Sequence, residues 1–463
     1  MSLSKSEFQS FPESSFKTSE ELKALVSKYG STTNNNRHSS LQSTYHVLSC
    51  LCILANITIA GWMFVGQDLT SLERLRGKAT TALSANFCVC IAIRNEHVIN
   101  MIVRIACSLP HRTPLRIRTS AARIYCHGGV HSGCAISGAI WYLVSTYLCL
   151  LGSPRASRTQ PALSFVSGIA MLLLIAILIF AHPSLRARHH NVFELTHRLL
   201  GWMFVGALWL QVILANIAKS AENARISGQY LLEDASFWLL VVSTALLIYP
   251  WTQLRLVSVE ANILSEHVVR LTVHHKNEAP CVTRRLATIP LKETHAFATI
   301  PGKDGTSYSM YISAAGDWTR GLIGNPPKRI WVKGRPTYGA TYSSGLFRKV
   351  LFVATGSGIA PVLSAVLARG VSEVVVFWIT SRPREQLDDE QLQELEAYRD
   401  HVIIHNQSRH NIVSADIPAT IYAIHREHQS EAVFVVSNPR LMKEVRGDLE
   451  RRDVPVFGPI FDS

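Results

Sequence analysis

The residues best suited to chemistry form a glycine-rich turn, Gly356-Ser357-Gly358, within the stretch KVLFVATGSGIAP. An apolar strand is expected to end at Thr355, and a helix to begin near Pro361, where a missing N–H group is tolerated. Glycines let the backbone approach a pyrophosphate, and the first N–H groups of a helix attract anions. The junction favours a dinucleotide site over a plain tight turn, and this site would consist of Gly356, Ser357, Gly358, Ile359, Ala360 and Pro361.

A second polar group follows the next apolar run, VVVFWIT, and contains Ser381, Arg382 and Arg384. In dinucleotide-binding folds an acidic residue at this place accepts the ribose hydroxyls of NAD, whereas a cation accommodates the 2′-phosphate of NADP. The basic residues therefore favour NADPH, with a solvated loop as the alternative. We assign Ser381 and Arg382 to this site.

These residues must be positioned by a parallel α/β domain, which we expect over residues 346–463. Apolar strand-like runs alternate there with helical patterns: KVLFVAT, VVVFWIT, HVIIHN and AVFVVSN. Over residues 253–345 the pattern changes to short β-type runs separated by polar and Gly/Pro turns. That pattern predicts a small antiparallel β-barrel or sandwich.

The first half of the chain reads as a membrane domain over residues 44–252. The chain has 463 residues, of which 48% are hydrophobic and only 17% are charged, a balance unusual for a soluble protein. Residues 1–43 are polar and lack a signal peptide, and we expect a disordered cytosolic tail. The apolar stretches predict a six-helix transmembrane bundle with spans at residues 44–65, 79–93, 124–151, 161–181, 192–217 and 235–251.

The distribution of charge and of cysteines argues against nucleic-acid binding, a disulfide framework and a zinc site. The formal net charge is +13, but the basic residues are scattered and form no single stripe, so we expect no nucleic-acid partner. Basic loops beside a membrane explain the charge better. None of the nine cysteines forms a CxxC pair, and we predict neither a disulfide framework nor a zinc site.

Three further motifs occur in the predicted barrel: HAFATIP from His295, GDWT from Gly316 and GRPTYG from Gly334. Their order and spacing resemble the landmarks of the ferredoxin-NADP reductase superfamily, specifically its membrane branch of ferric reductases and NADPH oxidases. The resemblance runs from residue 44 to the C-terminus and implies an FAD-binding barrel followed by an NADP-binding domain. Ala296 and Ala298 depart from the branch's His-Pro-Phe-Thr motif, and Thr299 is the candidate for the displaced hydroxyl.

The resemblance implies two sets of cofactor residues. The FAD set is His295, Phe297, Thr299, Trp318, Thr319 and, beside the flavin ring, the C-terminal aromatic Phe461. The NADP set gains Ser437, Asn438 and Pro439, which stand where the family has Cys-Gly-Pro below the nicotinamide. The loss of that cysteine puts efficient hydride transfer in question.

In the membrane half, residues 193–198 (FELTHR) resemble the start of the fifth span of the ferric reductase domain. The resemblance implies two haems between spans three and five, held by histidines 13 to 14 residues apart on each span. Aligned in this way, His197 is an inner ligand and His131 an outer ligand, while Leu210 and Ile117 replace their partners. Each haem would then lack one axial histidine.

A different alignment remains open for the same histidines. Counted from the flanking Arg123 and Arg188, His131 and His197 lie at similar depth, which leaves room for one rearranged haem. We expect no haem, or at most one with His131 and His197 as ligands.

Together the residues and the resemblance predict a membrane flavoprotein that passes electrons from NADPH to FAD and then to an unidentified acceptor. The narrower resemblance is to fungal TmpA-type integral membrane flavoproteins, which implies a role in development or secondary metabolism. We expect a plasma-membrane protein with both termini cytosolic, since NADPH is a cytosolic cofactor. The alternatives are a haem-containing transmembrane ferric reductase or NADPH oxidase, and a degenerate sensor or scaffold that binds nucleotide without turnover.

Overall fold

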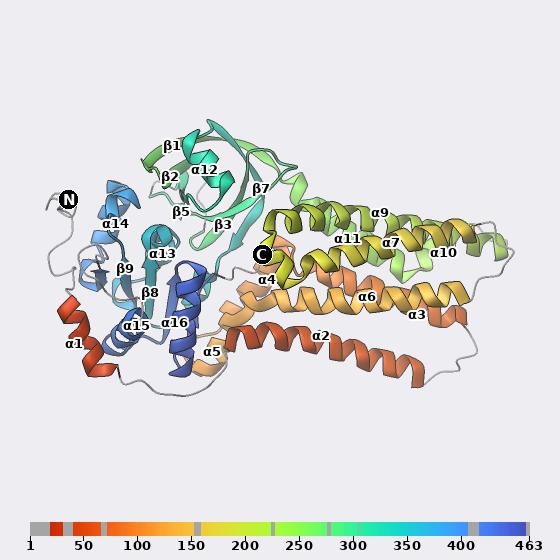
Figure 1. The fold of residues 1–463 in the computed structure, drawn as a ribbon, viewed down its shortest axis with the longest axis horizontal. Coiled ribbons are helices and arrows are strands. Elements are labelled where there is room, and N and C mark those ends of the chain that lie inside the picture. The colour runs from red at the N-terminus through yellow and green to blue at the C-terminus, as the bar shows by residue number, and fades with distance from the viewer. Residues whose placement is uncertain are drawn as a thin grey trace. The chain divides into compact units, whose positions relative to one another are not determined.

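The structure is a computed structural model that describes residues 19–30, 40–65, 72–151, 159–223, 227–275, 279–303, 305–405 and 416–459. The chain forms two compact units, whose elements are labelled in Figure 1. The two-sheet unit consists of Met1–Thr44, Glu96–Cys126 and Pro250–Ser463. The helical unit consists of Tyr45–Asn95 and His127–Tyr249.

Long apolar helices dominate the helical unit. They are α2 (Ser40–Val65), α3 (Leu72–Ala92), α6 (Gly128–Leu151), α7 (Gln160–Ala181), α9 (His190–Asn223) and α11 (Ala235–Thr252), joined in part by the short helices α8 (Pro183–Arg188) and α10 (Ser227–Glu233). Within the described residues, five helical stretches are long and apolar enough to cross a membrane: Thr44–Met63, Leu115–Leu151, Gln160–Ala181, His190–Ala218 and Ala235–Thr252. They correspond to five of the six predicted spans.

The remaining predicted span, residues 79–93, lies in α3 and is not one of these five stretches. Arg74, Arg76 and Lys78 in the first turns of α3 lower its hydropathy. The structure therefore has a long helix at each of the six predicted positions, and composition supports a membrane span for five of them.

A polar contact links three helices inside the helical unit. The side-chain amides of Asn56 on α2 and Asn86 on α3 exchange two hydrogen bonds, at 3.0 and 2.7 Å. The indole of Trp141 on α6 donates a third to the Asn56 oxygen, at 2.9 Å. Buried amides are costly without partners, so this network stabilises one mutual arrangement of the three helices.

The first sheet of the two-sheet unit is antiparallel. Its strands are β1 (Arg255–Ser265), β2 (Val268–His274), β3 (Val282–Ala287), β4 (His295–Ala298), β5 (Ile300–Pro301), β6 (Ser307–Ser313) and β7 (Arg329–Tyr338), in the order β4-β3-β7-β1-β2-β6-β5. Edge strand β4 also contacts β6, so the sheet curls towards closure, as Figure 1 shows. Alternate residues of β2, among them Val269, Leu271 and Val273, are fully buried inside the curl, as a period of two requires. The prediction of an antiparallel sheet here is confirmed.

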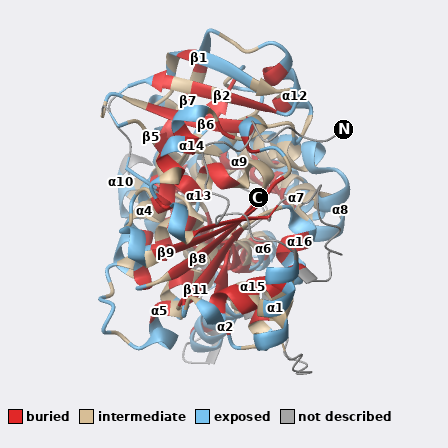
Figure 2. Ribbon diagram, turned by 90° about the vertical axis from the view of Figure 1, so that its left-hand side faces the viewer, coloured by how far each residue is buried: buried red, intermediate tan, exposed pale blue. Residues whose placement is uncertain are grey.

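The second sheet is parallel and has the order β10-β9-β8-β11-β12. Its strands are β8 (Val350–Thr355), β9 (Val374–Ile379), β10 (Val402–His405), β11 (Ala432–Val436) and β12 (Val456–Phe457). Phe352 and Ala354 pack with α13 (Ile359–Val366) and α14 (Asp389–Glu396), whereas Leu351 and Val353 pack with α15 (Asp416–Glu427) and α16 (Pro439–Arg451). Figure 2 shows these strands as a buried layer, which confirms the predicted parallel α/β arrangement.

The amino-terminal tail differs in part from the prediction. Within residues 1–43, predicted to be disordered, helix α1 (Ser19–Tyr29) is formed and packs against α15. Leu22 is buried in the core beneath the parallel sheet, and Lys28 and Tyr29 both bind the Glu427 carboxylate, at 3.0 and 2.7 Å. The polar composition of this segment suggested disorder. The buried leucine and the ion pair stabilise the helix through contacts with α15, which exist only in the folded protein.

The segment between the second and third predicted spans also differs from the prediction. It was placed in the membrane domain, but α4 (Glu96–Cys107) and α5 (Leu115–Ala122) belong to the two-sheet unit. Asn100 donates to the Pro336 carbonyl at 2.8 Å and accepts from the Tyr338 amide at 3.0 Å. Its side chain therefore pairs with the backbone of β7 as a neighbouring strand would.

A buried ion pair fixes α5 to the parallel sheet. The Arg118 guanidinium, 5% exposed, contacts both oxygens of Glu431, at 2.7 and 3.2 Å, and donates to the Leu346 carbonyl at 2.7 Å. Glu431 also accepts from the Arg348 amide at 2.7 Å. Partial burial acts to raise the Glu431 pKa, but the hydrogen bonds from Arg118 and Arg348 outweigh it and hold the pKa below the usual value.

Arg118→Ala is expected to lower the free energy of unfolding of the two-sheet unit by about 2–4 kcal/mol, because it leaves the Glu431 charge without its partner. The exposed Arg116 on the same helix is the matched control, and Arg116→Ala should change stability by less than about 0.5 kcal/mol. Thermal unfolding of the full chain, followed by tryptophan fluorescence, measures both effects. Equal losses in the two variants would contradict a stabilising role for the pair.

The same pair gives a pH dependence with a defined sign. Because the folded state lowers the Glu431 pKa, its contribution is complete above the unfolded value of about 4.3 and is lost as the pH falls through the lower folded value. The acid-induced part of the stability loss should therefore be smaller in the Arg118→Ala variant than in the unchanged chain.

Candidate functional site

The predicted dinucleotide turn lies at the carboxyl edge of the parallel sheet, where the strand order reverses. From β8 the chain proceeds outward to β9 and β10, then returns to the other side of β8 to form β11 and β12. The loops after β8 and β11 diverge at this switch point, which is where open α/β sheets bind ligands. Thr355, at the end of β8, and Ser437, after β11, are joined by a hydrogen bond of 2.7 Å between their hydroxyls.

Two glycines allow the turn to take this path. Gly356 has a φ of +51°, which favours glycine, and a Cβ on Gly358 would lie 2.5 Å from the Val436 carbonyl oxygen. The buried indole of Trp378, on the neighbouring strand β9, stabilises the turn by donating to the Gly356 carbonyl at 3.0 Å. Helix α13 follows at once from Ile359, so its first N–H groups lie beside the turn. This backbone geometry fits a pyrophosphate.

The barrel contacts this turn directly. Ser313, the last residue of β6, hydrogen-bonds through its hydroxyl to the hydroxyl of Ser357 at 2.5 Å. Ser357 belongs to the predicted site and Ser313 does not, because nothing in the order of the chain indicates which strand of the first sheet ends beside the turn.

The predicted NADP-selecting residues follow β9 at the same edge. Arg382 remains 57% exposed at its side chain, and its guanidinium pairs with Glu385 at 2.8 Å. Ser381 precedes it, and the Arg382 amide donates to the Thr380 hydroxyl at 3.3 Å. The arginine is therefore accessible to a phosphate, which would compete with Glu385 for it.

Asn438 and Pro439 begin helix α16 rather than lying free. The Asn438 side chain accepts the Leu441 amide at 3.0 Å and caps the helix, and Pro439 occupies the first turn. Ser437 precedes this cap, and its hydroxyl bonds to Thr355. Of the three predicted residues, Ser437 thus retains a polar side chain at the switch point, and Asn438 has a structural role.

The predicted FAD residues are brought together in part. The Trp318 ring lies 4.5 Å from the His295 ring and 5.8 Å from the Phe297 ring, between centroids, with Trp318 and Phe297 nearly parallel at 19°. The indole of Trp318 donates to the Thr288 hydroxyl at 3.2 Å. All three rings are partly exposed, so they provide an aromatic surface that suits a flavin ring.

The two predicted FAD threonines are committed to the protein itself. Thr299 is fully buried and donates to the Val282 carbonyl at 3.3 Å, so it does not supply the hydroxyl missing from the motif. The Thr319 oxygen accepts the amides of Ala315 and Gly316, each at 2.9 Å, and caps α12 (Asp317–Gly324). Phe461, the third aromatic of the prediction, lies outside the described residues.

Glu96 belongs to the two-sheet unit, and no motif in the sequence singles it out. Its carboxylate accepts the Arg335 amide at 2.6 Å and occupies the space in which a Cβ on Gly334 would lie, 2.1 Å from one carboxylate oxygen. Gly334 has a φ of +69° and begins the GRPTYG motif. Only the GRPTYG motif could have drawn attention to this place, since Glu96 is far from the motif in the sequence.

Cys281 is the cysteine closest in sequence to the predicted barrel motifs, and the structure gives it no nucleophilic role. Burial raises the pKa of its thiol to about 11 in spite of an opposing hydrogen bond with Thr341. All nine cysteines are free in the structure.

In the helical unit the two predicted haem ligands are neighbours. The ring centroids of His131 and His197 are 6.2 Å apart, and His131 Nδ1 lies 2.8 Å from the Cys90 carbonyl oxygen. The family alignment, which put these histidines about 20 Å apart in depth, is therefore wrong for this chain, and the reading from the flanking arginines is correct. The two imidazoles are in edge contact, with an angle of 60° between their planes.

No further histidine pair supports a second haem. The positions that follow His131 and His197 by 14 and 13 residues are Ser145 and Leu210. Within the described part of the chain, no group of three or more His, Cys, Asp or Glu side chains is arranged to hold a metal ion. Our expectation of no haem, or at most one, stays a prediction.

Comparison with known proteins identifies a reductase relationship. Residues 340–463 match the family described as "Adenylate-forming reductase 03009, C-terminal domain". The chain is 34% identical over 434 residues to adenylate-forming reductase 03009 of Coprinopsis cinerea (strain Okayama-7 / 130), covering 94% of this chain and 41% of that protein. It is 35% identical over 436 residues to adenylate-forming reductase 06235 of the same fungus, with the same two coverages. The chain thus spans about two fifths of the length of these relatives.

Two solved structures are similar to the chain over 45% of its length, both with a TM-score of 0.35. One is a mutant ferredoxin-NADP+ reductase from Plasmodium falciparum in complex with 2′P-AMP, 14% identical and covered over 96% of its chain. The other is a ferredoxin NADP+ reductase from Neisseria gonorrhoeae with bound FAD and NADP, 13% identical and covered over 98%.

Gly358→Ala is expected to weaken NADP+ binding by a factor of roughly ten or more, because the added methyl forces the turn away from the Val436 carbonyl. FAD content should not change, since the predicted FAD residues lie on the antiparallel sheet and not on this turn. Isothermal titration with NADP+ and flavin absorbance measure the two quantities. The control is Gly447→Ala on α16, where a Cβ meets nothing within 4 Å. Loss of FAD together with NADP+ affinity would contradict this division between the two sheets.

Proposed function

We propose that the chain is a membrane-bound oxidoreductase that takes electrons from NADPH onto FAD and passes them to a further acceptor. The observation that carries the proposal is the glycine turn at the switch point of the parallel sheet, with Gly358 packed against the Val436 carbonyl. The turn leads directly into α13, whose first N–H groups are suited to a pyrophosphate at this edge of the sheet. The reductase relatives support the class of reaction.

When bound, NADPH supplies a hydride and FAD accepts it; the chain provides binding and orientation. The turn at Gly356–Gly358 and the first turn of α13 would hold the pyrophosphate, and Arg382 the 2′-phosphate. Phe297 and Trp318 provide an aromatic surface on the barrel. The Ser313–Ser357 hydrogen bond joins the barrel to the turn, so the two proposed cofactor sites lie on elements that contact each other.

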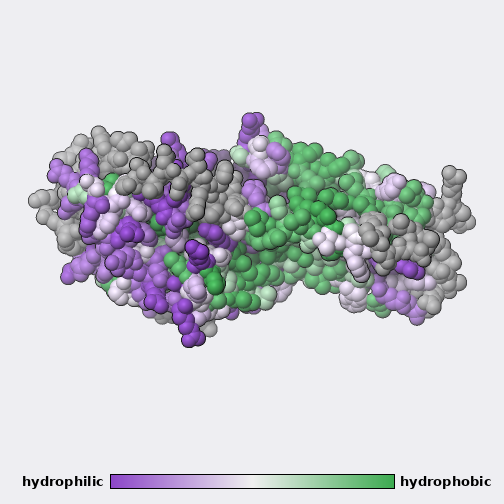
Figure 3. Space-filling view, turned by 90° about the horizontal axis from the view of Figure 1, so that it is seen from below, coloured by the Kyte–Doolittle hydropathy of each residue, from purple (hydrophilic) through white to green (hydrophobic). Residues whose placement is uncertain are grey.

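The membrane location rests on the surface of the helical unit. Large apolar side chains there face outward, among them Trp62, Phe165 and Leu172, exposed by 68, 70 and 68%. Figure 3 shows the hydrophobic side chains gathered over the helices. Exposure of so large an apolar surface to water would be unfavourable, whereas contact with lipid would not. This surface therefore supports an integral membrane protein. The plasma membrane and cytosolic termini are part of the same proposal.

Two kinds of molecule are candidates for the electron acceptor. One is an acceptor at the cytosolic face or in the membrane, as in the TmpA-type resemblance. The other comes from the relatives, both named adenylate-forming reductases, whose aligned regions cover 94% of this chain. On that basis the acceptor would be a compound presented as an adenylate or prepared through one.

An absorbance spectrum of the purified chain, before and after anaerobic addition of NADPH, tests the function. We expect the protein to leave the membrane fraction only with detergent and to show flavin bands that bleach on reduction. Flavin that binds but is not bleached would indicate the sensor alternative instead. A Soret band that shifts on reduction would indicate that His131 and His197 hold a haem, and would favour the transmembrane reductase alternative. Reoxidation of the bleached flavin by an added compound then identifies the acceptor class.

Arg382→Ala is expected to raise KM for NADPH by roughly tenfold or more while leaving KM for NADH unchanged, because only NADPH carries the 2′-phosphate. The matched control is Arg451→Ala at the far end of α16. Like Arg382, Arg451 pairs with a carboxylate three residues away in the sequence, in this case Asp448. Steady-state kinetics with an artificial acceptor measure both constants. An equal rise for NADH and NADPH would contradict the assignment of Arg382.

A further inference from the structure

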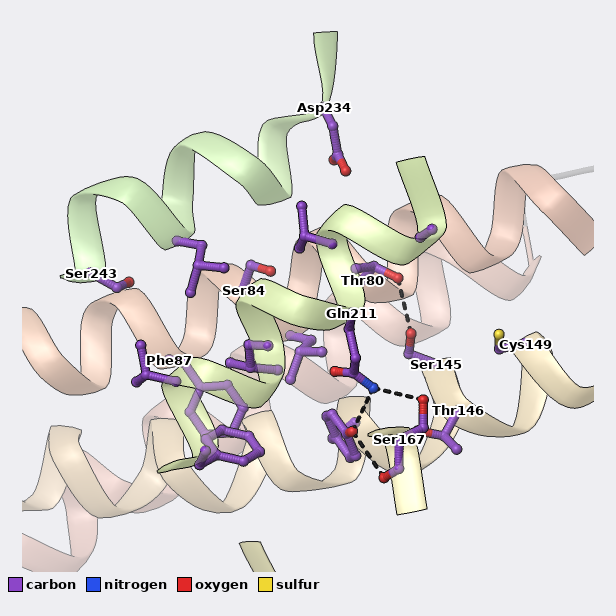
Figure 4. Close-up of a pocket in the computed structure, with 18 of the residues that line it drawn as sticks. Thr80, Ser84, Phe87, Ser145, Thr146, Cys149, Ser167, Gln211, Asp234 and Ser243 are labelled. Carbon is purple, nitrogen blue, oxygen red and sulfur yellow. Dashed lines mark hydrogen bonds between the residues drawn. The ribbon is translucent and has the colours of Figure 1, made fainter. Parts of the chain in front are cut away.

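The helical unit contains a pocket that the proposed function does not use. Its volume is about 140 Å³, and it lies between α3, α6, α7, α9 and α11. The lining is mostly apolar, with Leu83, Phe87, Phe204 and Leu208 among its members. Figure 4 shows how polar side chains from α3, α6, α7 and α9 enter the same space.

Gln211 of α9 is the polar residue that determines what the pocket can bind. Its side-chain nitrogen donates two hydrogen bonds, to the Tyr142 hydroxyl at 2.8 Å and to the Ser167 hydroxyl at 2.7 Å (Figure 4). The Tyr142 hydroxyl donates its own hydrogen bond to the Ser167 carbonyl, at 3.2 Å, so its oxygen can only accept from Gln211. This fixes the orientation of the amide, with both N–H groups used.

The Gln211 carbonyl oxygen is then an acceptor that needs a donor. None of the hydrogen bonds among the described residues uses it, and it is not a fully enclosed atom. Three of the hydroxyls that line the pocket are engaged elsewhere: Thr80 donates to the Arg76 carbonyl and receives from Ser145, and Ser243 donates to the Leu239 carbonyl. A ligand that satisfies the pocket therefore brings an O–H or N–H group.

Charge and size narrow the ligand further. The lining contains one basic residue, Arg76, and one acidic residue, Asp234, so its formal charges cancel and a neutral ligand is favoured. A volume of about 140 Å³ suits a single ring, since an engineered apolar cavity of about 150 Å³ takes up benzene. The apolar walls would surround the ring, and Gln211 would receive its hydroxyl.

We propose that this pocket is a binding site for a small neutral phenol-type molecule, an apolar ring with a hydroxyl that donates to Gln211. The site does not depend on FAD or NADPH, so it goes beyond the proposed function and can be tested on protein without either cofactor.

Fluorine NMR with 4-fluorophenol as the probe, and 4-fluorotoluene as the matched compound without a hydroxyl, tests the proposal on the detergent-solubilised full chain. We expect 4-fluorophenol to bind roughly fivefold more tightly than 4-fluorotoluene, the worth of one hydrogen bond. Gln211→Met should remove this preference and leave 4-fluorotoluene affinity unchanged. Equal affinities for both probes in the unchanged chain, or no saturable binding of either, would overturn the proposal.

A second pair of variants separates the pocket from lipid-like partitioning into the helices. Ala215→Phe places a ring inside the pocket and should abolish binding of both probes. Ile213→Phe makes a comparable change on the exposed side of the same helix, where the residue is 45% exposed, and should leave binding intact. If both probes still bind to the Ala215→Phe variant, the ligand lies elsewhere and the proposal fails.

Discussion

The Arg118–Glu431 ion pair is the interaction on which the two-sheet unit depends. Glu431 lies immediately before β11 and also accepts the Arg348 amide just before β8, so one carboxylate joins the starts of two central strands. Arg118 adds helix α5 and the Leu346 carbonyl to the same point. The opposite ends of β8 and β11 form the glycine turn and the Ser437 loop. Fixing one end of this strand pair therefore fixes the register of the other, where the candidate site lies.

Glycine has a second function in this unit, which is to permit close approach. Gly334 makes room for the buried Glu96 carboxylate, and Gly358 makes room for the Val436 carbonyl. The Glu96 carboxylate beside Gly334, together with the hydrogen bonds of Asn100 to the β7 backbone, attaches α4 to the strand that carries the GRPTYG motif. The segment between two predicted membrane spans is thus part of the structure that supports the cofactor motifs, and its stability affects them directly.

Several polar groups of the helical unit are satisfied in pairs. Asn56 and Asn86 exchange hydrogen bonds, and Gln211 is held by Tyr142 and Ser167. In an apolar environment an unpaired amide is costly, so each such side chain specifies its neighbours. The Gln211 carbonyl oxygen faces the pocket and accepts no hydrogen bond from the described residues. His131 is oriented by the Cys90 carbonyl at 2.8 Å, whereas Nδ1 of its neighbour His197 is buried without a hydrogen-bond partner among the described residues.

The sequence by itself determined the element types and their order, because hydrophobic periodicity and turn residues are local signals. Six helices, an antiparallel sheet and a parallel sheet occur where the apolar runs predicted them. Tertiary structure alone decided which distant residues meet. It buried Thr299, used Thr319 and Asn438 as helix caps, and put His131 beside His197. It also folded Ser19–Tyr29 against α15. Each of these outcomes depends on a partner far away in the chain, and no local pattern records the position of such a partner.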